Sequence, residues 1–169
     1  MEVLKNQVKY KLGNHIDTDV ITPGKYLTSY EPEYLGSICL TDVYPDFPEM
    51  LRGGGFVVGG INFGCGSSRE TAPIALKACG VKAIIAEEFS RIFYRNAWNI
   101  GLPVIICEGI AANADPGDVI SVFLDDGLVV NETKNVTLKC AKIPDLLMNI
   151  CQAGGLIEYL KNREEWPST

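Results

Sequence analysis

Three short, largely apolar runs divide the middle of the chain, at residues 55–60, 81–86 and 102–107. Runs of this length and composition are typical of strands that are buried on both faces of a sheet. The stretches between them, about residues 68–79 and 90–99, predict helices that end at or next to a glycine. A β-α-β-α-β order favours parallel strands joined by right-handed crossovers. The pattern therefore predicts an α/β fold built around a parallel sheet.

The segments on both sides of this central part predict further strands and helices. A loop rich in carboxylates and hydroxyls, residues 15–24, ends in a Pro-Gly turn, and three prolines allow only short helices over residues 30–50. After the third apolar run, an Asp-Asp-Gly turn joins two expected strands into a hairpin. The expected strands are 8–12, 118–124, 128–130 and 135–140, and the expected helices are 144–152 and 155–163. We expect a single α/β domain over residues 1–169 with added β-hairpins.

Composition excludes several classes of function. The chain has 15 basic and 21 acidic residues and a net charge of −6, which argues against a nucleic-acid partner. No run is long enough for a membrane helix, and the first residues lack the apolar core of a signal peptide. The six cysteines form no C-x-x-C pair, which predicts reduced thiols, a cytoplasmic protein and no metal site in this chain alone. Only one histidine is present.

The most informative segment is the glycine-rich loop GINFGCGSSRE, residues 60–70, between an expected strand and an expected helix. Gly64 and Gly66 permit positive φ and close approach of the backbone to a ligand. Backbone N–H groups at a helix start favour an anion, and Arg69 adds a bidentate donor for a carboxylate. Ser67 and Glu70 also match an S-x-x-E capping box, which many purely structural helices contain. The residues alone therefore leave an anion site and a structural cap as alternatives.

The strings GINFGCGSSRE, FSRIFYRNAWNIGLPVI and NHIDTDVITPGKYL resemble the small subunits of the isopropylmalate isomerase and homoaconitase family, which are similar to the swivelling C-terminal domain of aconitase. The resemblance covers about residues 13–107 and rests on three motifs in the same order. It implies a swivelling β/β/α domain and a separate large subunit that carries a [4Fe-4S] cluster. It also implies stereospecific dehydration and rehydration of a small hydroxy acid.

The resemblance assigns roles to matching residues. Ser67 is the expected base, and Ser68 and Arg69 are expected to bind a substrate carboxylate or to stabilise the Ser67 alkoxide. Asp19 corresponds to an aspartate of the active-site network. A serine is a poor base unless its alkoxide is stabilised, and helix N-terminal amides with a guanidinium would do this without a histidine. Further expected substrate-binding residues are Cys65, Gly66 and Thr28.

Substrate choice depends on the loop that contains Thr28. Homoaconitases and aconitases place an arginine about here to bind a third carboxylate, whereas this chain has Thr28 and Ser29. An unpaired third carboxylate would be costly in the site. We therefore expect an alkylmalate, isopropylmalate of leucine biosynthesis first and a dimethylmalate or methylmalate next. A homoaconitase subunit and a non-catalytic anion-binding module are the alternatives.

Several other side chains have more than one interpretation. His15 is a proton carrier or an ordinary loop residue. Asp17 is a general acid or base, a cation ligand, or a cap for loop amides. Cys65 is a reactive thiol, a cluster ligand, or a small buried thiol. Arg91 and Arg95, four residues apart on one expected helix face, line the site or a subunit interface, or pair with Glu87 and Glu88 in a solvated face. The aromatic residues Phe93 and Trp98 are expected in the core.

Overall fold

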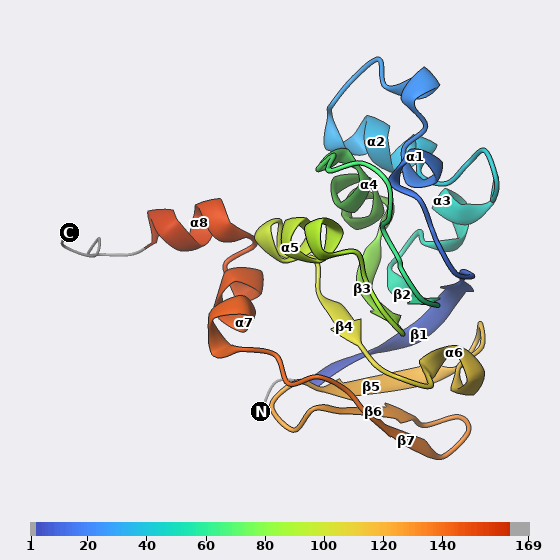
Figure 1. The fold of residues 1–169 in the computed structure, drawn as a ribbon, viewed down its shortest axis with the longest axis vertical. Coiled ribbons are helices and arrows are strands. Elements are labelled where there is room, and N and C mark those ends of the chain that lie inside the picture. Colours follow the sequence, from blue (N-terminus) through green and yellow to red (C-terminus); the bar gives the residue numbers. More distant parts are fainter. Residues whose placement is uncertain (1–2, 163–169) are drawn as a thin grey trace.

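The computed structural model describes residues 3–162 and contains a seven-stranded mixed sheet with strand order β4-β3-β2-β1-β5-β6-β7 (Figure 1). The strands are β1 (Val3–Lys11), β2 (Gly55–Gly59), β3 (Val81–Ala86), β4 (Val104–Ile106), β5 (Val119–Phe123), β6 (Leu128–Asn131) and β7 (Val136–Lys139). All three apolar runs in the middle of the chain form strands, as predicted. The α/β fold class is therefore confirmed.

The sheet has a parallel half and an antiparallel half that meet at β1. Strands β1 to β4 pair in parallel, with Val8 opposite Phe56 and Ile84 opposite Val104. On its other side β1 pairs with β5 in antiparallel register, and β5, β6 and β7 continue as antiparallel hairpins. These hairpins are the predicted additions to the parallel core. The chain thus combines buried strands in one half with strands that are exposed on one face in the other.

Helices connect and cover these strands. They are α1 (Thr18–Ile21), α2 (Pro32–Ile38), α3 (Phe47–Met50), α4 (Thr71–Cys79), α5 (Arg91–Asn99), α6 (Ile110–Asn113), α7 (Asp145–Gln152) and α8 (Leu156–Lys161), with a 3-10 turn at Gly24–Tyr26. Helix α2 packs on α4, and α5 contacts α7. Residues 30–50 contain only short helices, as their prolines predict. Residue 163, the end of the last predicted helix, lies outside the described residues.

Near the candidate loop the structure differs from the expectation in two respects. The loop over residues 15–24 contains a one-turn helix, α1, which Asp17 caps by accepting a hydrogen bond from the Asp19 N–H at 2.7 Å. The helix expected from residue 68 begins instead at Thr71, so the end of the glycine-rich loop is not helical. No helix in residues 3–162 is long and apolar enough to cross a membrane.

The core lies between the sheet and its helices, and aromatic side chains extend it to the glycine-rich loop. Phe93 and Trp98 are 2% and 1% exposed, which confirms them as core residues. Phe63 packs edge-on against Phe89, with ring centroids 5.7 Å apart, and lies 5.5 Å from the Phe93 ring. The loop is therefore anchored at Phe63 between β2 and α5, and its last three residues, 68–70, are exposed.

Candidate active site

Two glycines allow the loop of residues 60–70 to follow its path. Gly64 has φ +78°, and a β-carbon there would overlap the ring of Phe93. Gly66 has φ +95°, and a β-carbon there would lie 2.5 Å from the Asp17 carboxylate. Other residues rarely adopt such φ values, and these close approaches leave no space for a side chain. Both positions therefore require glycine for the backbone to pass between α5 and the segment before α1.

The loop is bound along its length to the segment around Thr18. The Gly64 N–H donates to the carbonyl of Ile16, and the Thr18 N–H donates to the carbonyl of Cys65, each at 2.8 Å. The Thr18 hydroxyl accepts from the Ser67 N–H at 2.9 Å and donates to the Ser67 carbonyl at 3.3 Å. Thr18 is only 1% exposed. This buried threonine fixes the backbone of Ser67, a role that no local sequence signal indicates.

Of the two alternatives for Ser67, the capping box does not form. Glu70 is the N-cap of α4, and no side-chain oxygen caps that helix. The Ser67 hydroxyl makes no hydrogen bond to another of the described residues, because Thr18 holds the Ser67 backbone outside the helix. The N–H groups of Gly66, Ser68 and Arg69 likewise find no acceptor in residues 3–162. The helix start lies four residues beyond Ser67, so free N–H groups of the loop itself are the donors available to an anion.

Arg69 and Asp19 meet beside this loop. The guanidinium Nη1 of Arg69 lies 2.6 Å from Asp19 Oδ1, and the two side chains are 41% and 59% exposed. An ion pair this exposed adds little to stability, so its main effect is to orient the guanidinium. An arginine has five N–H donors, and one pairing leaves others for a carboxylate. The structure thus brings together two residues that are 50 apart in the sequence and that the resemblance assigns to the site.

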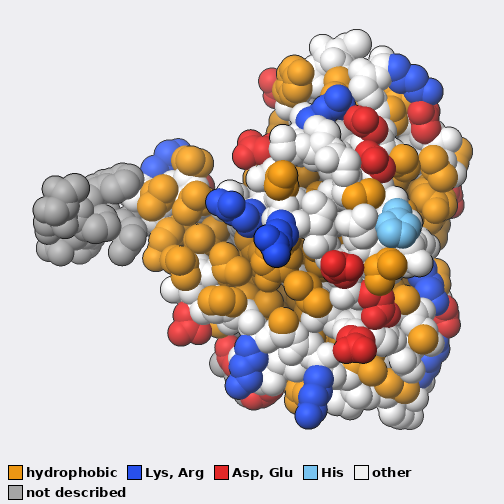
Figure 2. Space-filling model, viewed as in Figure 1, with side chains coloured by type: hydrophobic (Ala, Val, Ile, Leu, Met, Phe, Trp, Pro, Cys, Tyr) orange, Lys and Arg blue, Asp and Glu red, His pale blue; other side chains and the backbone are white. Residues whose placement is uncertain are grey.

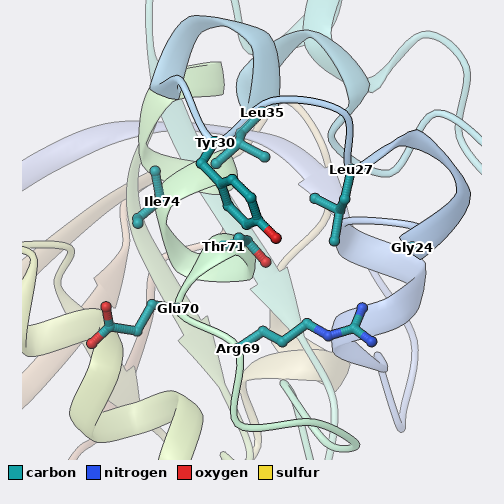
Figure 3. Close-up of a pocket in the computed structure, with 8 residues that line it drawn as sticks. All are labelled: Gly24, Leu27, Tyr30, Leu35, Arg69, Glu70, Thr71 and Ile74. Carbon is teal, nitrogen blue, oxygen red and sulfur yellow. The ribbon is translucent and has the colours of Figure 1, made fainter.

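Arg69 lies at the edge of a cavity of about 640 Å³ (Figure 3). Leu27, Tyr30, Leu35 and Thr71 surround the space, and the Glu70 carboxylate turns away from it (Figure 3). The complete lining is Gly24, Leu27, Tyr30, Leu35, Arg69, Glu70, Thr71 and Ile74. The site therefore combines one basic group with a mostly apolar wall.

Thr28 is placed differently from these lining residues. Its hydroxyl donates to the Tyr34 hydroxyl at 3.0 Å, and that hydroxyl donates to the carbonyl of Tyr26 at 2.5 Å. Thr28 is not among the residues that line the cavity, whereas its neighbour Leu27 is. Leu27 and Tyr30 are therefore the residues next to Thr28 that line the cavity, and a substrate contact of Thr28 stays a prediction.

Cys65 lies in the glycine-rich loop, and His15 lies beside it. Burial, and secondarily the charge of Asp17, raises the pKa of the Cys65 thiol above its usual range. The thiol is therefore protonated at neutral pH, which disfavours a role as nucleophile or metal ligand. His15 Nδ1 lies 3.2 Å from the side-chain nitrogen of Asn62. This contact ties the histidine to the far end of the loop.

Helix α5 forms a hydrogen bond to the glycine-rich loop. The Asn96 side chain donates to the carbonyl of Ser68 at 3.2 Å, a contact that sequence patterns did not indicate. Glu87 accepts from the N–H groups of Gly109 and Ala111, at 2.7 and 2.9 Å. The Glu87 carboxylate therefore caps the start of α6. Among the described residues, neither Glu87 nor Glu88 forms an ion pair with the arginines of α5, which was one of the alternatives.

The described residues do not form a ligand set for an iron–sulfur cluster. No group of three or more His, Cys, Asp or Glu side chains in residues 3–162 is arranged to hold a metal ion. All six cysteines are free thiols, and Cys65 is the one that lies in the glycine-rich loop. An iron–sulfur cluster needs several thiolates close together, so the described residues of this chain do not fit one.

The comparisons with known proteins agree with the fold and the loop. The family model of the aconitase C-terminal domain matches residues 4–108. The isopropylmalate/citramalate isomerase small subunit of Methanocaldococcus jannaschii is 48% identical over 161 residues, 95% of each chain. The 3-isopropylmalate dehydratase small subunit of Caldicellulosiruptor saccharolyticus is 47% identical over 162 residues, 94% of each chain.

A solved structure provides the same match in three dimensions. The crystal structure of a 3-isopropylmalate dehydratase from Methanocaldococcus jannaschii superposes with a TM-score of 0.87 at 44% identity, covering 96% of each chain. The resemblance read from the three motifs is thereby confirmed. The chain belongs to the aconitase C-terminal domain family, among the small subunits of its isopropylmalate dehydratases and isomerases.

Proposed function

We propose that this chain is the small subunit of a 3-isopropylmalate dehydratase, a hydro-lyase that isomerises its substrate by dehydration and rehydration in leucine biosynthesis. Its full-length relatives with that name support the reaction class. The observation that carries the substrate choice is the single arginine beside a cavity with mostly apolar walls. A carboxylate fits the guanidinium of Arg69, and the branched alkyl group fits Leu27, Leu35 and Ile74.

In this proposal Ser67 moves the proton at the carbon next to a carboxylate. Thr18 fixes the Ser67 backbone through two hydrogen bonds, and this sets the point from which the hydroxyl projects. Arg69, oriented by Asp19, binds that carboxylate and stabilises the serine alkoxide electrostatically. The free N–H groups of Ser68 and Gly66 are the further donors to the anionic substrate. Cys65 stays a neutral thiol in this loop and contributes packing at the edge of the substrate.

The rest of the active site belongs to a large subunit in this proposal. The relatives' names as small subunits support such a partner. We assign the [4Fe-4S] cluster to that subunit, because the described residues of this chain supply no ligand set for it. The small hydroxy acid then binds between the two chains, and no nucleic acid or membrane takes part.

A methylmalate is the second candidate substrate. The Methanocaldococcus jannaschii relative is named for citramalate as well as isopropylmalate, and a cavity of about 640 Å³ admits the smaller group. A tricarboxylate is disfavoured, because Arg69 is the only basic side chain among the described residues that line the cavity.

The test is a substrate series on the complex reconstituted with its large subunit under anaerobic conditions. We expect kcat/KM for isopropylmalate to exceed that for homocitrate by at least about 100-fold, the cost of an unpaired carboxylate. Ile74→Ala should lower kcat/KM about 10-fold for isopropylmalate and leave that for citramalate nearly unchanged. Ile157→Ala, at a residue that is 64% exposed on α8, is the matched control. Equal turnover of homocitrate would refute the assignment.

A further inference from the structure

Two arginines on the outer face of α5 have no partner in the described part of the chain. Arg91 and Arg95 are exposed and lie one turn apart. The other two described arginines are paired, Arg52 with Glu49 at 2.7 Å and Arg69 with Asp19 at 2.6 Å. In a chain with a net charge of −6, two adjacent unpaired guanidiniums make a local basic site.

An apolar surface continues from these arginines over α7. Ile92 is 50% exposed on α5, and Leu146 is 54% exposed on α7. Figure 2 shows basic side chains over α5 beside a broad apolar area that extends over α7. Large apolar patches flanked by charge are typical of protein interfaces. We define the α5–α7 face as Arg91, Ile92, Arg95, Leu146 and Leu147.

A small cleft adjoins this face. The cleft, of about 170 Å³, lies between the helices and is lined by Tyr94, Arg95, Trp98, Asn99 and Leu147. The indole Nε1 of Trp98 is buried and makes no hydrogen bond of ordinary geometry. The indole still faces the Tyr94 hydroxyl closely enough to oppose the rise in the Tyr94 pKa that burial causes. The cleft adds a hollow beside Arg95 and Leu147 to this face.

The same helix connects this face to the candidate active site. Asn96, one turn after Ile92, donates to the carbonyl of Ser68, and Phe93 packs under Gly64. The side chains of Asp19, Ser68 and Arg69 are exposed in this chain by itself. A second chain that completes the site must cover those residues, and α5 is the element that lies directly beside them.

We propose that the α5–α7 face docks the large subunit, which presents carboxylates to Arg91 and Arg95 and apolar side chains to Ile92 and Leu146. This inference rests on the proposed function, because that function requires a large subunit. The partner is acidic at this contact, since two guanidiniums that lose water need negative partners. Arg91 and Arg95 act in assembly and do not touch the substrate.

The experiment measures binding and turnover separately with the purified chain and its native large subunit. Isothermal titration gives the Kd, and the rate at increasing large-subunit concentration gives kcat of the complex. We expect Arg91→Glu with Arg95→Glu to raise the Kd about 100-fold and to leave kcat at saturation unchanged. The matched control, Lys9→Glu with Lys82→Glu, makes the same charge change on the β1–β3 surface and should alter the Kd less than about threefold. Thermal melting confirms that each variant is folded.

The outcomes separate this inference from the proposed function. If the unmodified complex turns over isopropylmalate and the arginine variant binds as tightly as the control, the docking face is wrong while the function stands. If the complex forms and the arginine variant weakens it, yet no alkylmalate is dehydrated, the face stands and the function fails. A chain that self-associates through Arg91 and Arg95, with unchanged affinity for the large subunit, would show that a second copy occupies the face and would overturn the proposal.

Discussion

Replacing Thr18 by valine tests how the structure positions Ser67. Thr18 is 1% exposed, and its hydroxyl makes two hydrogen bonds to the Ser67 backbone, at 2.9 and 3.3 Å. Valine has nearly the same shape, so the substitution removes these bonds without leaving a cavity. A typical bond contributes about 0.5–1.5 kcal/mol, and an unsatisfied donor adds to the cost. With one bond of good length and one long bond, we expect a loss of about 2 kcal/mol in the free energy of unfolding.

The effect on turnover should be larger than the effect on folding. For a chain of 169 residues, about 2 kcal/mol lowers Tm by roughly 6 °C, which leaves the protein folded at the assay temperature. The loop would lose the contact that fixes Ser67, and a displacement of about 1 Å in a reacting group can cost about 100-fold in rate. We expect kcat of the reconstituted complex to fall between about 10- and 100-fold.

Ser121→Ala is the matched control for this substitution. Ser121 lies on β5, in the antiparallel half of the sheet, and is 2% exposed. Its hydroxyl donates to the Glu132 carboxylate at 2.6 Å. It should lower the unfolding free energy by a similar amount, about 1–2 kcal/mol, and leave kcat unchanged. The assays are urea unfolding of the chain and steady-state turnover of the complex. If Thr18→Val keeps the kcat of the control, Thr18 does not position the proton-transfer group and the account of the loop is wrong.

Three further predictions concern other parts of the molecule. Gly64→Ala should lower the free energy of unfolding by more than about 3 kcal/mol, because a β-carbon at φ +78° would also overlap the Phe93 ring. Its control, Gly117→Ala, has φ +98° but open space around it and should lower the unfolding free energy by only about 1 kcal/mol, as measured by urea unfolding. Hydrogen bonds from Lys11 and Lys134 lower the pKa of Asp115 to about 2. The contribution of this carboxylate to stability is therefore present above about pH 4 and is lost as the pH falls toward 2. Lys134→Met should raise the pKa of Asp115, as an NMR titration would show. Burial raises the pKa of Cys107 to about 12, so iodoacetamide at pH 8 should not modify this thiol until urea unfolds the chain. Mass spectrometry of the labelled cysteines would test this, and labelling of Cys107 in the native state would contradict its burial.

The parallel half of the fold could be predicted because its signals are local. The apolar run Val81–Ala86 and the glycine after α4 each indicate their element within a few residues. The position of β1 could not be predicted, because it depends on pairing with β2 on one side and with β5, more than 100 residues later, on the other. Periodicity shows that a segment is a strand and gives no information about its neighbours.

The candidate site was predictable only in part, for the same reason. Gly64, Gly66 and Arg69 occur in one contiguous motif, so the sequence identifies them directly. The S-x-x-E pattern left a structural cap open as an alternative, and the cap does not form because the tertiary bonds from Thr18 to Ser67 prevail over the local preference for a helix start. The apolar wall of the cavity comes from separate segments, with Leu27 before α2 and Ile74 on α4. No sequence pattern joins these residues until the helices pack.

The most direct test of the central claim is the turnover of isopropylmalate by the chain, by the large subunit and by their mixture under anaerobic conditions, with Ser67→Ala alongside. The account predicts no turnover by either chain alone and full turnover by the mixture. The Ser67→Ala mixture should bind with the unchanged Kd and lose at least about 1,000-fold in kcat, because the proton-transfer group is gone. A Ser67→Ala complex that turns over at the rate of the unmodified complex would contradict the account.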